Sequence, residues 1–211
     1  MTYNVDPQNA IRFADSLSLP AVLADCWQSL EKSTRVRDCG WRLPVLGTAG
    51  DRGIRQRIVV LRKVVPLERR LLVHTDARSP KIDAIQQDSQ VSWLFYDHAA
   101  MSQLQVEGTT RIHTNDDVAD RLWASEPEAS LRGYMAPLRP GTDCDTHEFN
   151  LPESVIGRIP ERSQLQSARD NFAVVSCEVQ SIEWLLLRRE GNLRARFEYL
   201  PDGVKQQWLA P

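Results

Sequence analysis

The sequence has few cysteines and no long apolar run. Its four cysteines show no C-x-x-C spacing, and so few thiols in 211 residues argue against a disulfide framework. No apolar stretch approaches the roughly 18 residues that a membrane span needs. The first residues, MTYNVDPQNA, also lack the charged start and apolar segment of a secretory leader. We therefore expect a cytoplasmic protein with reduced thiols and no membrane partner.

A large excess of one charge is missing as well. The 26 Lys and Arg side chains nearly balance the 28 Asp and Glu side chains, which gives a formal net charge of -2. No net field therefore draws the chain onto nucleic acid or anionic lipid. We expect no nucleic-acid partner.

Familiar metal-binding and phosphate-binding motifs are also absent. The only local pair with metal-like spacing is Cys144 with His147, and two ligands do not make a zinc site, so we expect no metal. The glycine-rich stretch GTAGDRG at 47–53 fits neither G-x-G-x-x-G nor G-x-x-x-x-G-K-[ST]. It lies between two apolar-alternating segments, which is typical of a hairpin turn.

The composition is that of an ordinary globular domain. Hydrophobic residues make up 42% of the chain and charged residues 26%, and the length fits one domain over residues 1–211. Leu19, Val22, Cys26 and Leu30 recur at helical spacing, which predicts an N-terminal helix near 20–33.

The remaining segments favour strands with helices inserted between them. Strands are expected near 41–46, 55–65, 69–76, 90–97 and 103–114, with three or four more in the tail from Phe172. Helices are expected at 79–88, where Ser79 is the cap, and after Asn115, also a cap. The Pro-rich segment 137–170 reads as irregular, with one short helix. Antiparallel hairpins of this kind favour a closed or split β-barrel over a parallel doubly wound sheet.

The tryptophans fall on the apolar faces of these expected elements. We therefore predict a place in the core for those at 41, 93, 123, 184 and 208.

Four sequence blocks occur in a fixed order. They are RIVVLR at 57–62, VHT followed by SPK at 73–81, QLQVEGTTRI at 103–112, and RFEY with WLAP at 196–211. From about residue 41 to the C-terminus, the chain thereby resembles the pyridoxamine 5'-phosphate oxidase family. The resemblance implies a mainly β fold with inserted helices, the FMN-binding split β-barrel, with FMN as cofactor. It also implies a homodimer with the flavin across the subunit interface.

The resemblance assigns the FMN phosphate to two cations. Arg57 and Lys81 occupy the matching positions, and Thr75 and Ser79 could add hydroxyl donors. A charge-assisted hydrogen bond contributes roughly 1.5–3 kcal/mol, so two cations suit a phosphate. From the residues alone, solvation at the surface explains both cations better than a phosphate site does.

The flavin ring is assigned to other segments. Val59, Val60 and Leu61 match the strand that supports the ring, although the same residues also suit a barrel core. Gln103 and Arg196 match a glutamine and an arginine near the flavin.

The substrate positions depart from the family pattern. Arg62 stands for a lysine, Leu122 for a tyrosine and Glu126 for an arginine, whereas Ser130 is retained. Asn192, Leu193 and Arg194 replace an Arg-Leu-His triplet. Glu126 would repel a phosphorylated vitamer.

No catalytic residue is assigned from the sequence. Arg62 and His74 are candidate cofactor contacts. Arg62 and Arg194 are also candidates to recruit an anionic substrate, and His74 is a candidate proton donor.

Three functions are compatible with these residues. The first is an FMN-dependent oxidoreductase of unassigned substrate. The second is a flavin-binding store or sensor without turnover, and the third is a pyridoxamine 5'-phosphate oxidase with a rebuilt substrate pocket. A barrel that has lost flavin or holds another cofactor, such as haem, also stays open.

Overall fold

The computed structural model describes residues 17–50 and 53–211. Its strands are β1 (Val45–Thr48), β2 (Arg55–Ile58), β3 (Leu61–Val65), β4 (Arg70–Asp76), β5 (Gln90–Asp97), β6 (Ser102–His113), β7 (Phe172–Leu186), β8 (Leu193–Leu200) and β9 (Gly203–Leu209). Its α-helices are α2 (Leu19–Arg35), α3 (Pro80–Gln87), α4 (Asp117–Ser125) and α5 (Glu128–Leu131). Short 3₁₀ helices are η1 (Gly40–Arg42), η2 (Pro66–Glu68), η3 (Arg132–Met135), η4 (Glu153–Val155) and η5 (Arg162–Asn171).

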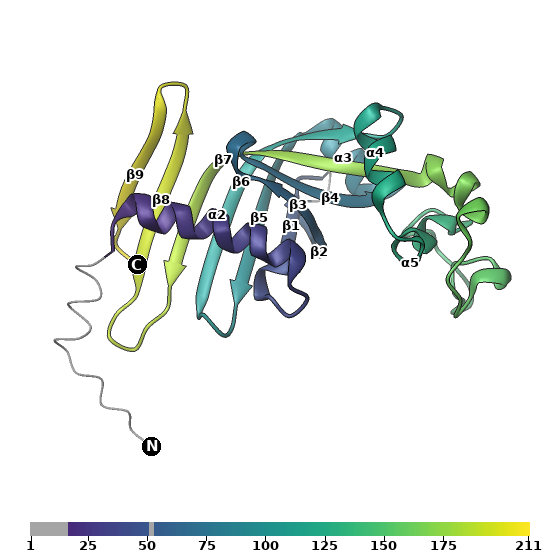
Figure 1. Ribbon diagram of the computed structural model, residues 1–211, viewed down its shortest axis with the longest axis horizontal. Helices are drawn as coiled ribbons and strands as arrows, with labels where there is room; N and C mark the ends of the chain where they lie inside the picture. The colour runs from purple at the N-terminus through teal and green to yellow at the C-terminus, as the bar shows by residue number, and fades with distance from the viewer. Residues whose placement is uncertain (1–16, 51–52) are drawn as a thin grey trace, which may run out of the picture.

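The nine strands form one sheet in the order β2-β1-β5-β6-β7-β4-β3, and β8 and β9 extend it from β7 (Figure 1). All strand pairs that the structure describes are antiparallel. The expected mainly β fold with inserted helices is confirmed. Within the described ranges, no helix has the length and apolar character needed to cross a membrane.

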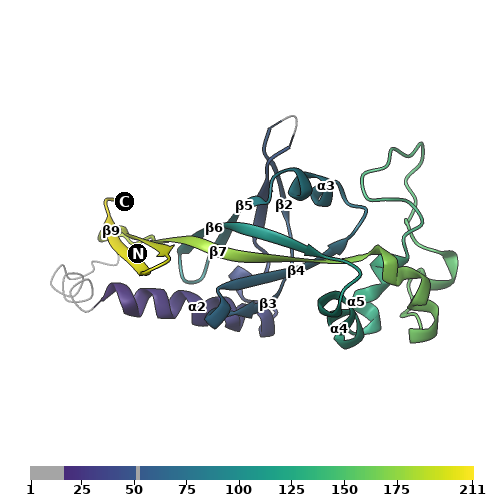
Figure 2. The ribbon, with the colours of Figure 1, turned by 90° about the horizontal axis from the view of Figure 1, so that it is seen from above.

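Alternation along the strands separates an inner from an outer sheet face. In β5, the side chains of Trp93 and Phe95 are fully buried, whereas Leu94 and Tyr96 on the other face are 40% and 42% exposed. This follows from the two-residue period of a strand. The helix α2 covers the inner face and buries Leu30 completely against it (Figure 2).

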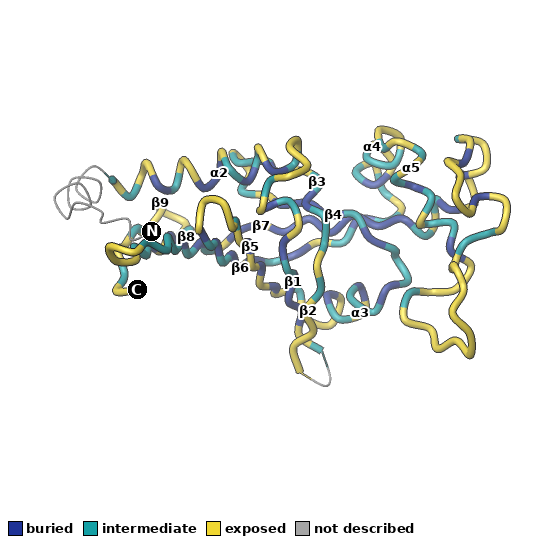
Figure 3. The backbone as a smooth tube through the Cα atoms, turned by 90° about the horizontal axis from the view of Figure 1, so that it is seen from below, coloured by how far each residue is buried: buried dark blue, intermediate teal, exposed yellow. Residues whose placement is uncertain are grey.

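A second core lies at the other end of the molecule. There β7 begins beside α4 and α5 (Figure 2), and Leu72 of β4 packs with Phe172 and Val174. The residues from 141 to 150 are all exposed, as the tube in Figure 3 shows for this loop. The expected irregular segment near 137–170 is confirmed, and its short helix is the 3₁₀ helix η5.

Several expected elements are confirmed with small shifts. The N-terminal helix is α2, whose cap Ser18 accepts a hydrogen bond from the Ala21 N–H at 3.4 Å. The helix α3 and the β5–β6 hairpin also lie where the sequence predicts. The predicted cap Asn115 is wrong: Asp116 caps α4 and accepts from the Ala119 N–H at 3.0 Å.

Two expected strands are divided. The segment 41–46 begins as η1 and becomes β1 only at Val45, and the segment 55–65 splits into β2 and β3 around Val59 and Val60. The strands β2 and β3 lie at opposite ends of the sheet order, so the chain must cross here from one edge to the other. The Val59 N–H donates to the Pro44 carbonyl at 3.0 Å during this crossing.

The tryptophan prediction holds in part. Trp41, Trp93 and Trp184 are buried, and Trp123 is partly buried. Trp208 is 42% exposed, so its predicted core position is wrong. It lies on β9, which within the described part of the chain pairs with β8 alone, and a terminal strand leaves much of its surface uncovered.

Candidate functional site

Lys81 lies in the first turn of α3, directly after the end of β4. Its Nζ donates to Thr75 Oγ1 at 2.7 Å and to Ser79 Oγ at 2.8 Å. Ser79 occupies the predicted cap position, but its hydroxyl makes no capping hydrogen bond. The first turn of α3 therefore has no side-chain cap, and Ser79 serves Lys81 instead.

Arg57 extends from β2 on the inner face of the sheet. Its Nη1 donates to Thr48 Oγ1 at 2.8 Å and to the Leu46 carbonyl at 3.2 Å. Leu46 and Arg57 are partners in the β1–β2 register, which places both side chains on one face. The role of Thr48 is missed by sequence reasoning because it depends on this register.

The two cations line one groove. The groove has a volume of about 430 Å³. The loop residues Pro140 and Gly141 line it together with Arg57 and Lys81. Burial lowers the pKa of Lys81, and the nearby charge of Arg57 lowers it further. Burial also lowers the pKa of Arg57. Within residues 17–50 and 53–211, neither cation forms an ion pair with an acidic side chain.

This donor set fits a phosphate group. Two partly buried cations without a counterion lose free energy through mutual repulsion, and a dianion between them would remove it. The hydroxyls of Thr75 and Ser79 and the uncapped N-terminus of α3 add neutral donors. The groove therefore fits the phosphate of a flavin mononucleotide.

The three residues expected to support the flavin ring differ in exposure. Val59 and Val60 are partly exposed in the crossing between β2 and β3. The Leu61 side chain is 0% exposed and belongs to the main core. Leu61 therefore has no exposed surface that could contact a ligand in this chain.

Arg62 and His74 meet a third residue, Glu126, that caps the C-terminus of α4. Arg62 Nη1 lies 3.8 Å from Glu126 Oε2, and His74 Nδ1 lies 3.5 Å from Glu126 Oε1. Successive strand residues face opposite sides, so His74 faces away from Thr75 and the Lys81 groove. Because Glu126 lies 3.8 Å from Arg62, its carboxylate compensates the positive charge of Arg62.

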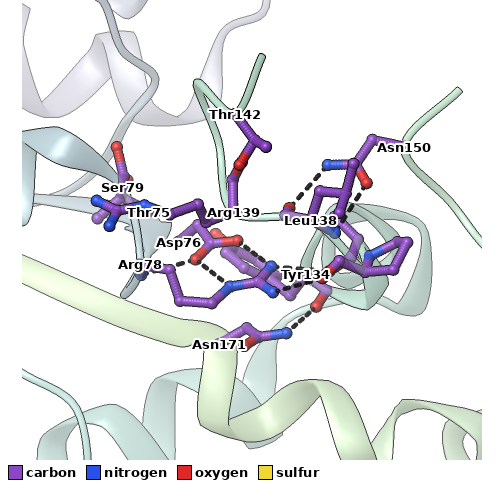
Figure 4. Close-up of polar contacts among 12 residues, drawn as sticks. Thr75, Asp76, Arg78, Ser79, Tyr134, Leu138, Arg139, Thr142, Asn150 and Asn171 are labelled. Carbon is purple, nitrogen blue, oxygen red and sulfur yellow. Dashed lines mark hydrogen bonds and ion pairs between the residues drawn. The ribbon is translucent and has the colours of Figure 1, made fainter. Parts of the chain in front are cut away.

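The loop beyond the groove is anchored by Arg78 (Figure 4). Its guanidinium binds Asp76 through Nε at 3.0 Å and Nη2 at 2.7 Å. The same guanidinium donates from Nη2 to the Ala136 carbonyl at 2.8 Å. Farther along, the Asn150 amide accepts from the Leu138 N–H at 3.0 Å and donates to its carbonyl at 2.8 Å. These contacts hold the start of the loop beside the groove.

A second pocket adjoins this anchor. It has a volume of about 510 Å³, and its lining includes Thr75, Asp76, Ser130, Tyr134 and Asn150. Burial raises the pKa of the Tyr134 hydroxyl, so it stays protonated at neutral pH. Ser130, the retained substrate position, therefore lies in a pocket next to the cation groove.

Gln103, Arg194 and Arg196 lie apart from the groove. Gln103 of β6 and both arginines of β8 are on the outer face of the sheet, whereas Arg57 is on the inner face. The strands β1 and β5 separate Gln103 from Arg57, which corresponds to about 14 Å at the usual strand spacing. One chain does not bring these residues together.

The search for a metal site among the described residues finds no group of three or more His, Cys, Asp or Glu side chains. Cys144 and His147 are both exposed in the loop.

Comparisons with known proteins match these features. Residues 28–114 match the sequence model of the pyridoxamine 5'-phosphate oxidase FMN-binding domain. No curated protein sequence matches the chain.

Solved structures are similar over most of the chain. A pyridoxamine 5'-phosphate oxidase-related, FMN-binding protein from Nostoc punctiforme has a TM-score of 0.67 at 19% identity and covers 93% of this chain and 99% of its own. PhzG from Burkholderia lata has a TM-score of 0.66 at 18% identity, and the match covers 94% of this chain and 96% of PhzG. A protein related to general stress protein 26 from Clostridium acetobutylicum has a TM-score of 0.50 at 12% identity, and the match covers 80% of this chain and 94% of that protein.

At these identities, structural likeness establishes the fold alone, and the sequence match shows similarity to the FMN-binding domain over residues 28–114. The resemblance is thereby confirmed for the three blocks between residues 57 and 112, which lie within the match, and the split-barrel prediction is confirmed as well. Residues 28–114 are similar to the FMN-binding domain of the pyridoxamine 5'-phosphate oxidase family, and the chain has the split-barrel fold.

Proposed function

We propose that this chain binds FMN in the groove between β2 and α3 and acts as an FMN-dependent oxidoreductase. The observation that carries this proposal is the pair Arg57 and Lys81, which share a groove and have only neutral hydrogen-bond acceptors. Bound FMN supplies hydride transfer, and the protein supplies binding and orientation. We further propose that residues 1–211 act as one domain.

Each residue of the groove has a distinct task in this proposal. Arg57 and Lys81 hold the phosphate, with Thr75 and Ser79 as hydroxyl donors. Val59 and Val60 follow the end of β2 at Ile58, and their partly exposed side chains would support the ring.

We propose that the active form is a homodimer with FMN at the interface. The β2-β1-β5 registers align Ile58, Val45 and Leu94 in one row on the outer sheet face. Ile58 is 67% exposed and Leu94 is 40% exposed, and an uncovered apolar row of this kind favours burial by a partner. A second chain could also bring Gln103 and Arg196 to a flavin held by Arg57.

The substrate would occupy the pocket that Ser130 lines, beside the groove. Arg62 is already compensated by Glu126 at 3.8 Å, so it offers little net attraction to a second phosphate. The neutral lining groups Ser130, Tyr134 and Asn150 suit a substrate that carries uncharged polar groups. This favours a substrate other than a phosphorylated vitamer.

The first experiment identifies the cofactor. Tag-free protein is purified, its absorption spectrum is recorded, and the supernatant after heat denaturation is analysed for released flavin. We expect about one FMN per chain, since each chain has one Arg57–Lys81 groove. A colourless protein that neither binds nor quenches added FMN would refute the proposal.

Variants of the two cations locate the site. Arg57→Ala and Lys81→Ala should each weaken FMN binding by roughly one to two decades, because each removes a charge-assisted contact. Lys63→Ala, at an exposed position on β3, is the matched control and should bind FMN as the parent does. Wild-type affinity in Arg57→Ala would remove the phosphate from this groove.

Reduction kinetics distinguish an enzyme from a flavin store. The FMN-loaded protein is mixed with NADH or NADPH without oxygen, and the loss of flavin absorbance is followed. An oxidoreductase should be reduced faster than free FMN. A rate no higher than that of free FMN with both donors would favour the non-catalytic alternative.

A further inference from the structure

Glu183 of β7 holds two arginines of β8 on the outer sheet face. Its Oε1 accepts a hydrogen bond from Arg194 Nε at 2.8 Å and a second from Arg194 Nη2. Its Oε2 accepts from Arg196 Nε at 3.1 Å and from Arg196 Nη2 at 2.9 Å. Each guanidinium group therefore binds the Glu183 carboxylate through its own Nε and Nη2 atoms.

This arrangement fixes the orientation and the charge of the trio. Arg194 and Arg196 are two residues apart on one strand, so their side chains are neighbours and their charges repel. Burial opposes ionisation of Glu183, but the hydrogen bonds from both arginines outweigh burial and lower its pKa. The trio therefore carries one net positive charge.

The arginines keep donors for a further partner. Their side chains are 37% and 44% exposed, and among the described residues Nη1 of neither Arg194 nor Arg196 has a partner. Gln105 is the register partner of Glu183 on β6, so an amide extends the same polar surface. Fixed N–H donors on a flat sheet face suit a planar ring whose edge carries hydrogen-bond acceptors.

We propose that Glu183 is a positioning residue that presents Arg194 and Arg196, as a pair with a single net charge, to the FMN ring. This inference rests on the proposed function, in which FMN lies between two chains. The carboxylate prevents the arginines from separating, and it halves the positive charge that the ring meets. Glu183 thereby sets the reduction potential of the bound flavin.

The test replaces the Glu183 charge and measures the potential. Glu183→Gln leaves two uncompensated cations near the ring, which favours reduced FMN because it carries more negative charge. We expect reduced FMN to gain about tenfold in affinity relative to oxidised FMN, which raises the midpoint potential by about 30 mV. Glu183→Asp keeps the charge and should return the potential toward the parent value.

The matched control is Glu178→Gln on the same strand. Glu178 also pairs with an arginine, Arg69, at 3.2 Å, so this variant breaks an equivalent ion pair elsewhere on β7. It should leave the potential unchanged, and thermal unfolding of all three variants should confirm that they fold.

The outcomes separate this inference from the proposed function. An unchanged potential in Glu183→Gln, or an equal shift in Glu178→Gln, overturns the role of Glu183 while FMN binding stands. If the parent protein binds no FMN, the proposed function fails and this inference fails with it.

Discussion

The imidazole of His74 lies 3.5 Å from the carboxylate of Glu126, yet its environment favours the neutral ring. The His74 side chain is 3% exposed and packs edge-on against Phe172, with ring centroids 5.0 Å apart. Its Nε2 is buried and has no hydrogen-bond partner among the residues that the structure describes. Burial, and then the charge of Arg62, lower the pKa of His74 to about 4, although Glu126 on the α4 side favours protonation.

Stability should therefore fall as the pH falls from about 6.5 to about 4. In this interval the unfolded chain binds a proton at His74 and the folded chain does not, so the free energy of unfolding rises with pH. The lowered pKa of His74 corresponds to about 3 kcal/mol in the free energy of unfolding. This contribution is fully present above pH 6.5 and is lost as the pH falls toward 4. His74→Leu should flatten this part of the profile, measured by urea denaturation, whereas His147→Gln in the exposed loop should not. An unchanged acid profile in His74→Leu would contradict the assignment.

Glu126→Gln should change the ligand preference of the pocket beside the groove, because the charges of Glu126 and Arg62 act on Tyr134 in its lining. It removes the carboxylate that compensates Arg62, so affinity for a phosphorylated probe, pyridoxal 5'-phosphate, should rise about tenfold. Glu128→Gln, which removes a carboxylate 3.9 Å from Arg162 on the neighbouring helix, is the control. Equal affinity of parent and Glu126→Gln for the probe would show that Arg62 does not face the ligand.

Mixing two defective variants should restore part of the FMN binding. If each flavin contacts Arg57 of one chain and Arg196 of the other, a heterodimer of Arg57→Ala and Arg196→Ala has one intact site and one doubly altered site. Refolding the two variants together should therefore recover about a quarter of the parent's sites when chains pair at random. No recovery at concentrations that support dimers would mean that both arginines act within one chain or that Arg196 does not contact FMN.

Gly108→Ala should destabilise the barrel. The glycine lies at the irregularity in the β6–β7 register, and an added Cβ would collide with the Glu178 carbonyl and lie 2.8 Å from Cys177 Sγ. The backbone must shift to relieve this contact, at a cost of about 1–3 kcal/mol or more. Gly133→Ala, where an added Cβ meets nothing within 4 Å, is the matched control. Thermal unfolding of both variants measures the difference, and equal midpoints would contradict the predicted clash.

Local patterns were sufficient to predict much of the secondary structure. The 3.6-residue spacing of Val22, Cys26 and Leu30 predicts α2, and the alternation in β5 predicts a half-buried strand. Such patterns record which face of an element meets the core, and this depends on neighbours only a few residues apart. The four blocks likewise identified Arg57 and Lys81, which the structure brings to one groove.

Contacts between distant residues were decided only by the tertiary structure. The division between β2 and β3, the contact of Arg57 with Thr48 and the bridge of Glu126 to His74 all join segments that local periodicity treats separately. Strand register and helix docking set these contacts, and both result from packing of the whole sheet. The sequence by itself indicated the resemblance to an FMN-binding domain, the barrel and the two cations, whereas the fold decided which charges are compensated and which stay available to a ligand.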